Sequence, residues 1–242
     1  MWTLYKKEIR SFLGSLIAYI VMGVYLLLTG LFLWFVDGNN LFDLGVASLQ
    51  VMFDISPFIL IFLVSAITMR SISEEKRLGT LEIITTKPLT DRAIILSKFF
   101  ASVSLIILTL LPTLFYVYAI YNLAQPVGNI DLGSTAGSYL GLILLAACYA
   151  SIGLFSSAIT DNQIVALITS MVISFFFYSV LSMLGDIDWL DQIGKSLSWF
   201  GLEYHFDSIS RGVIDTRDVI FFLGFSSIFL GFTQLVFESR KW

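Results

Sequence analysis

Long apolar stretches, each free of Asp, Glu, Lys and Arg, dominate the chain. Five of them are long enough to cross the hydrocarbon core of a bilayer as a helix, which needs about 20 mostly apolar residues. They are residues 11–36, 99–130, 132–160, 162–185 and 219–237. A sixth stretch, residues 55–69, reaches this length if its helix begins near Gln50, with Asp54 at headgroup depth and Arg70 extending to the opposite interface. The pattern therefore predicts six membrane-spanning helices.

We expect an all-α membrane protein with one transmembrane domain over residues 1–242. Its spans are placed at residues 12–36, 50–70, 94–121, 136–159, 164–184 and 218–237. Pro112 predicts a kink in the third span, because proline removes a backbone hydrogen bond of the helix. Gly133, Gly137 and Gly141 recur every four residues near the start of the fourth span, which indicates close helix packing.

A shorter helical pattern precedes the first span. Trp2, Tyr5 and Ile9 recur at helical spacing, and Lys6 and Lys7 lie between them. This spacing predicts an amphipathic helix over residues 2–10 that lies in the membrane interface. The alternative is a positive flank that only fixes the topology.

Composition supports a membrane protein and narrows its chemistry. Apolar residues make up 57% of the 242 residues and charged residues 13%, whereas soluble domains average about 45–50% and about 25%. The single cysteine, Cys148, excludes an intramolecular disulfide and a cysteine-based zinc site. A net charge of −4 gives no indication of nucleic-acid binding.

The lysines and arginines are distributed unevenly across the predicted spans. All but three of the 14 lie on the side that holds both termini, and the other side has Lys195, Arg211 and Arg217. Because cytoplasmic loops of membrane proteins carry an excess of Lys and Arg, we expect both termini to be cytoplasmic.

Little catalytic or ion-coupling chemistry is visible. Asp54 is the only acid or base that we assign to the spans, and it is peripheral, which argues against a proton-coupled carrier or an ion pump. Gly194-Lys195-Ser196 resembles the end of a phosphate-binding loop, but Trp189 stands where the first glycine is required. We therefore expect no enzyme and no nucleotide site in this chain.

Residues 71–89 form the largest connection on the predicted cytoplasmic side. Ser71 and Glu74 have the spacing of a capping box, which predicts a helix that starts there. Glycine costs a helix about 1 kcal/mol relative to alanine, so we expect a break at Gly79–Thr80. Thr90 is the candidate N-cap of the third span. A solvated loop is the alternative to a capped helix that docks a soluble partner.

The largest connection on the other side is residues 185–216. Trp189, Ile193, Leu197 and Phe200 recur at helical spacing there, which predicts one or two interfacial helices. The only histidine, His205, cannot form a metal site alone, so we expect a packing role for it.

These features together resemble a known family. Residues 74–82, Glu-Glu-Lys-Arg-Leu-Gly-Thr-Leu-Glu, followed by Pro88 and by Lys98 in the next span, resemble the signature of ABC-2 type permeases, the membrane subunits of ATP-driven exporters. The resemblance runs from the Lys6-Lys7-Glu8 start through all six spans. Residues 160–166, Thr-Asp-Asn-Gln-Ile-Val-Ala, and the short length make the chain similar to the GldF permeases of gliding-motility transporters in Bacteroidota.

This resemblance implies a type V exporter-like half-transporter in the bacterial inner membrane. The implied partners are a cytoplasmic GldA-like ATPase dimer that binds ATP and magnesium, a GldG-like accessory membrane protein, and a second permease copy, identical or homologous. No cofactor is implied in the chain itself. The helix after the second span becomes the coupling helix, flanked by the N-terminal helix. Its implied ATPase contacts are Glu74, Glu75, Lys76, Arg77, Leu78, Gly79, Thr80 and Glu82.

Two other functions stay open. A structural anchor for a motility or secretion complex, with no translocation, fits the few polar groups in the spans equally well. A secondary carrier requires essential carboxylates within the spans, and Asp54 at the periphery is a poor candidate.

Overall fold

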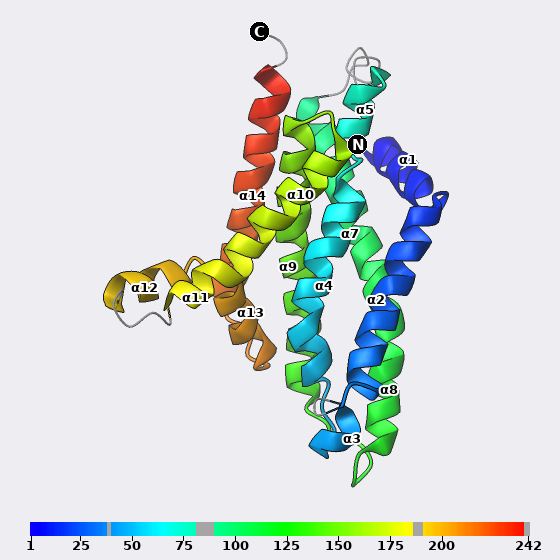
Figure 1. The fold of residues 1–242 in the computed structure, drawn as a ribbon, viewed down its shortest axis with the longest axis vertical. Coiled ribbons are helices and arrows are strands. Elements are labelled where there is room, and N and C mark those ends of the chain that lie inside the picture. The colour runs from blue at the N-terminus through cyan, green and yellow to red at the C-terminus, as the bar shows by residue number, and fades with distance from the viewer. Residues whose placement is uncertain (38–39, 81–89, 186–190, 240–242) are drawn as a thin grey trace.

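A computed structural model describes residues 1–37, 40–80, 90–185 and 191–239 of the chain. The described residues form helices and contain no strand. Six helical segments are long and apolar enough to cross a membrane, and they run side by side in a bundle (Figure 1). The predicted fold class, an all-α protein with six membrane-spanning helices, is therefore confirmed.

Four spans are centred on single helices and two are composite. The single helices are α2 (Leu16–Trp34), α4 (Gln50–Thr68), α9 (Leu132–Ile159) and α14 (Thr216–Ser239). The composite spans join α7 (Asp91–Leu110) to α8 (Leu114–Leu123) and α10 (Gln163–Phe175) to α11 (Leu181–Gly185). The shorter helices are α1 (Trp2–Leu13), α3 (Leu41–Leu44), α5 (Ser73–Arg77), α12 (Asp191–Ser198) and α13 (Leu202–Ser210).

The fourth span, α9, is the centre of the bundle. It packs against α4, α7, α10, α13 and α14, and most of its residues are buried. Gly153 makes the contact with α4 possible, because a Cβ there would overlap the side chain of Thr68. Small residues let helix backbones approach closely where no hydrophobic effect drives association.

Hydroxyl groups tie the spans together elsewhere in the bundle. Tyr25 on α2 is hydrogen-bonded to Ser56 on α4 at 2.9 Å. Ser65 on α4 is hydrogen-bonded to Ser170 on α10 at 2.8 Å. In a bilayer such pairs satisfy polar groups that have no water to bind, so these hydroxyls serve packing.

Each composite span is interrupted at a specific local feature. The third span contains a 3₁₀ turn at Leu111–Thr113, around Pro112, where the sequence predicts a kink. The fifth span contains a π turn at Phe176–Val180. Proline causes the first interruption, and no comparable sequence signal marks the second.

The bundle has two distinct ends. The α5 end holds α1, α5 and the end of α14, and the α3 end lies opposite it (Figure 1). The chain turns between α1 and α2 at Gly14 and Ser15, so α1 extends to Leu13 and the first span begins at Leu16, later than the expected residue 12. The segment after the fifth span, where the sequence predicts one or two helices, contains α12 and α13.

The glycines at the start of α9 pack against α13 and the turn that follows it. A Cβ on Gly137 would overlap the carbonyl oxygen of Ile209, and one on Gly141 would contact the ring of Phe206 at 3.0 Å. The main chain of Gly133 lies against Gly212, whose φ of +87° requires glycine. The repeat thus accommodates α13 rather than another span.

Candidate functional site

A buried lysine organises the α5 end of the bundle. Lys98 on α7 is 2% exposed, and three oxygen atoms surround its Nζ. It donates a hydrogen bond to the carbonyl oxygen of Ser71 at 2.6 Å and lies 3.3 Å from Glu8 Oε1 and 2.9 Å from Glu75 Oε2. Lys98 therefore connects α7 to α1, to α5 and to the turn before α5.

A second lysine completes this group of charges. Lys7 on α1 lies 3.4 Å from Glu75 and 3.6 Å from Glu8, and its side chain is largely exposed. We call Lys7, Glu8, Ser71, Glu75 and Lys98 the Lys98 cluster. Its two cations and two carboxylates balance, which is the arrangement that makes burial of charge tolerable.

A serine of α9 holds the start of α5. Ser157 Oγ accepts hydrogen bonds from the backbone N–H groups of Ile72 and Ser73 at 3.1 and 3.0 Å, and it donates one to the carbonyl of Met69. Lys76 adds a hydrogen bond to the carbonyl of Ala158 at the end of α9. The start of α5 is therefore capped from another span.

The predicted capping box is not formed. The N-cap of α5 is Ile72, and Ser71 Oγ accepts no cap hydrogen bond from a backbone N–H group of the helix. The reason is that Ser71 is buried beside Lys98, while Ser157 already occupies the free N–H groups. The predicted break is present, since α5 ends at Arg77 and Gly79 adopts φ +67°.

The structure divides the residues assigned to ATPase contact into two groups. Glu75 and Lys76 turn inward, toward α7 and α9, rather than outward. Arg77, Leu78 and Gly79 are exposed, Leu78 by 62%, and Glu74 and Thr80 are partly exposed. Glu82 lies outside the described residues. The outward surface at this end is therefore narrower than the sequence predicts.

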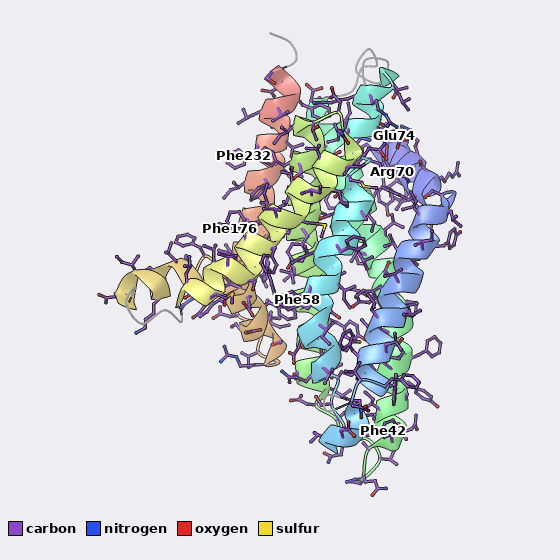
Figure 2. The ribbon with its side chains drawn as sticks, in the orientation of Figure 1. Phe42, Phe58, Arg70, Glu74, Phe176 and Phe232 are labelled. Atoms are coloured by element: carbon purple, nitrogen blue, oxygen red, sulfur yellow. The ribbon has the colours of Figure 1, made fainter. Side chains whose placement is uncertain are left out.

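A cavity of about 360 Å³ lies beside the Lys98 cluster, between α1 and α5. Arg70 and Glu74 line it and lie next to α1 (Figure 2). Within the described part of the chain, Arg70 Nε and Ser71 Oγ are buried without a hydrogen-bond partner. Both can donate to an acceptor that enters the cavity, so this end can receive a polar group of another molecule.

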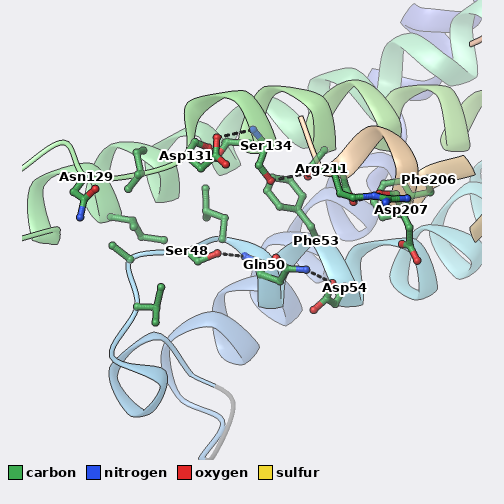
Figure 3. A pocket seen from close by; sticks show the side chains of 18 residues that line it. Ser48, Gln50, Phe53, Asp54, Asn129, Asp131, Ser134, Phe206, Asp207 and Arg211 are labelled. Carbon is green, nitrogen blue, oxygen red and sulfur yellow. Dashed lines mark hydrogen bonds between the residues drawn. The ribbon is translucent and has the colours of Figure 1, made fainter. Parts of the chain in front are cut away.

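A larger cavity, of about 710 Å³, lies toward the α3 end, between the starts of α4 and α9 and the end of α13. Asp54, Asp131, Asp207 and Arg211 line it (Figure 3). We call it the acidic cavity. Burial raises the pKa of Asp207 to about 6, with smaller contributions from Glu203 and Asp54 and an opposing one from Arg211.

The single histidine has the packing role that the sequence suggests. His205 Nδ1 lies 2.7 Å from Asp218 Oδ1 and its Nε2 lies 2.9 Å from the carbonyl of Trp199, while its ring stacks on Phe221. These contacts join α13 to the start of α14. Among the described residues, no three His, Cys, Asp or Glu side chains are grouped so that they could hold a metal ion.

Sequence reasoning does not find the pairings at the centre of the site. It places Lys98 among the cytoplasmic charges and in the family signature, although this lysine lies within the expected third span, and it names Glu8 only in the Lys6-Lys7-Glu8 start. The signal was a lone lysine inside residues 94–121, since a charge at such a position is rare and usually paired. Ser157 carried no comparable signal among the many serines of the spans.

Comparison with known proteins identifies the family of this chain. The profile described as ABC-2 family transporter protein matches residues 4–238, which is nearly the whole chain. No protein of curated function matches the sequence. The match includes most of α1, α5 and all six spans, and with them every residue of the Lys98 cluster. This multi-pass membrane protein therefore belongs to the ABC-2 family of transporter proteins.

Proposed function

We propose that the chain is the permease subunit of an ATP-driven exporter. Separate ATPase subunits bind ATP and magnesium, and their movement is transmitted to the spans through α5. Membership of the ABC-2 family, which implies an ATPase partner and a non-catalytic membrane component, supports the first part. The Lys98 cluster is the observation that carries the second.

The cluster supports transmission because it joins three helices at one point. Lys98 on α7 is bound to Glu8 on α1 and to Glu75 on α5, and Ser157 attaches the same segment to α9. A displacement of α5 is therefore shared by four helices, since paired buried charges resist separation. The exposed side of α5, with Arg77 and Leu78, is the contact surface for the ATPase.

Reversal of charge on this exposed side tests the proposal. Glu74→Lys with Arg77→Glu changes two side chains outside the Lys98 cluster, whereas reversal of Glu75 would also break the cluster. We expect co-purification of the ATPase subunit to fall about tenfold or more, because charged contacts central to an interface each contribute more than about 1 kcal/mol. The amount of chain inserted in membranes should not change.

Glu238→Lys is the matched control, because Glu238 lies at the same end of the bundle, at the end of α14, away from α5. Unchanged co-purification in the double variant would contradict the proposal. Normal function with an ATPase that binds but cannot hydrolyse ATP would instead favour a structural anchor.

We also propose that the chain acts in the inner membrane of a gliding bacterium, with both termini cytoplasmic. The distribution of Lys and Arg supports the orientation. The similarity of residues 160–166 to GldF permeases supports the assignment to a gliding-motility transporter. It likewise supports a GldA-like ATPase, a GldG-like accessory protein and a second permease copy as partners. Labelling of Arg77→Cys and Lys195→Cys in intact cells tests the orientation, and only the second should react from outside. Deletion of the gene should abolish gliding.

A further inference from the structure

An open groove lies between α1 and α7 and is separate from the cavity beside the Lys98 cluster. Its volume is about 420 Å³, and Met1, Trp2, Tyr5, Ser97, Phe100 and Ser104 line it. The rings of Trp2 and Phe100 are 65% and 47% exposed. Tyr5 is hydrogen-bonded to Ser104 at 2.8 Å, which holds α1 against α7. We call it the Trp2 groove, and its walls are mostly apolar.

The exposed charge of α1, the helix that forms one wall of the groove, is entirely positive. The only acid of α1, Glu8, is buried and paired with Lys98. Lys6 and Arg10 are exposed and stand four and eight residues after Trp2, so all three share one face of the helix. Lys6 Nζ lies 5.2 Å from the centre of the Trp2 ring. Lys6 and Arg10, which form no salt bridge with an acid of the described residues, therefore follow an apolar wall.

We propose that the Trp2 groove binds an anionic phospholipid. One acyl chain lies against Trp2, Tyr5 and Phe100, and the phosphate lies near Lys6 and Arg10. An amphipathic helix places such a groove at the boundary between headgroups and acyl chains. A net-anionic headgroup matches the two cations, whereas the choline of a zwitterionic lipid adds a third positive charge. The inference does not depend on the ATPase.

Quenching of Trp2 fluorescence by brominated lipids tests this proposal on the full chain in bilayers. The signal of Trp2 is the difference between the unaltered chain and Trp2→Phe. A basic residue near an anionic surface contributes about fivefold in binding, so two predict that brominated phosphatidylglycerol associates about 25-fold better than brominated phosphatidylcholine. For the unaltered chain, a higher salt concentration in the buffer should reduce this preference, because salt screens the attraction between the cations and the anionic headgroup.

Lys6→Gln with Arg10→Gln should bring the preference close to one. Lys195→Gln with Arg217→Gln removes two exposed cations elsewhere and should leave the preference unchanged. Equal quenching by the two lipids, or a preference that survives the first double substitution, would overturn the proposal. Failure of both lipids to quench Trp2 would also overturn it, because another part of a protein would then cover the groove.

Discussion

The Lys98 cluster and the acidic cavity arrange charge in opposite ways, since the cluster is centred on a buried lysine and the aspartates of the cavity are exposed to it. In the cluster, two lysines face two glutamates at 2.9 to 3.6 Å, and the charges balance. In the cavity, Asp54, Asp131 and Asp207 outnumber Arg211, whose Nε donates to the main-chain carbonyl of Asp207. Balanced buried charges hold a fixed geometry, whereas uncompensated carboxylates favour protonation or a bound cation.

The difference indicates which region is rigid and which can change. The cluster joins α1, α5 and α7 through the Nζ atom of Lys98, so these helices are expected to move as a unit. The acidic cavity is walled by side chains of α4, α9 and α13 together with the loop before α4. We therefore expect substitutions in the cluster to cost the most stability. Substitutions in the cavity should change how the stability of the chain depends on pH.

Removal of Lys98 gives the largest expected effect. Lys98→Met leaves Glu8 and Glu75 with only the largely exposed Lys7 as a partner, and the loss of one member of a buried ion pair costs about 3–5 kcal/mol. Unfolding of the purified chain in mixed detergent micelles measures this loss. Adding Glu8→Gln and Glu75→Gln to Lys98→Met should recover much of it, and a triple variant no more stable than Lys98→Met would show that charge compensation is not the cause.

At the other end of the bundle, Gly137→Ala tests how tightly α13 closes the acidic cavity. The new methyl group would overlap the carbonyl of Ile209, and overpacking of this kind costs about 1–3 kcal/mol. The same detergent unfolding assay applies. Gly133→Ala is the matched control, because a Cβ there meets only the side chain of Asp131, at 3.3 Å. Equal stability of the two variants would mean that α13 shifts to accept the methyl group. The acidic cavity would then not be closed tightly, which would weaken its contrast with the Lys98 cluster.

Ser157→Ala removes the cap of α5 without touching a charge. Loss of a helix cap costs about 1 kcal/mol, and the effect should be confined to the turn and α5. Faster hydrogen exchange at Ile72 and Ser73 is the measurement. Ser156→Ala is the control, because Ser156 is equally buried but its hydroxyl has no partner within the described structure. Unchanged exchange in Ser157→Ala would show that the Lys98 cluster alone holds α5.

Features that depend on neighbouring residues could be predicted from the sequence. The number of spans follows from apolar length, and the break at Gly79 follows from the conformational freedom of glycine. The predicted cap of the third span is confirmed, because Thr90 Oγ1 accepts from Ala93 N at 3.3 Å. These signals lie within a few residues of the structure that they specify, so one sequence contains them in full.

The site depended on pairings across long sequence separations, and these could not be predicted. Glu8 and Lys98 are 90 residues apart, and Ile72 and Ser157 are 85 apart. The local pattern favoured Ser71 as a cap, but tertiary packing placed that serine beside Lys98 instead. A charge inside an apolar span shows that a partner exists, but only the fold shows which residue it is.

The smallest expected effect concerns the pH dependence that the acidic cavity confers. Because the pKa of Asp207 is raised to about 6 in the folded chain, the folded state holds a proton between about pH 4 and pH 6 that the unfolded state has released. Stability therefore falls as the pH rises through that window. Asp207→Asn removes the ionisation, so the variant should gain in melting temperature over the unaltered chain at about pH 7.5 but not at about pH 4.5. Asp215→Asn, at an exposed site that does not line the acidic cavity, should show no such difference. A gain of equal size at both pH values would indicate a packing effect. The acidic cavity would then confer no pH dependence, and its contrast with the compensated Lys98 cluster would be lost.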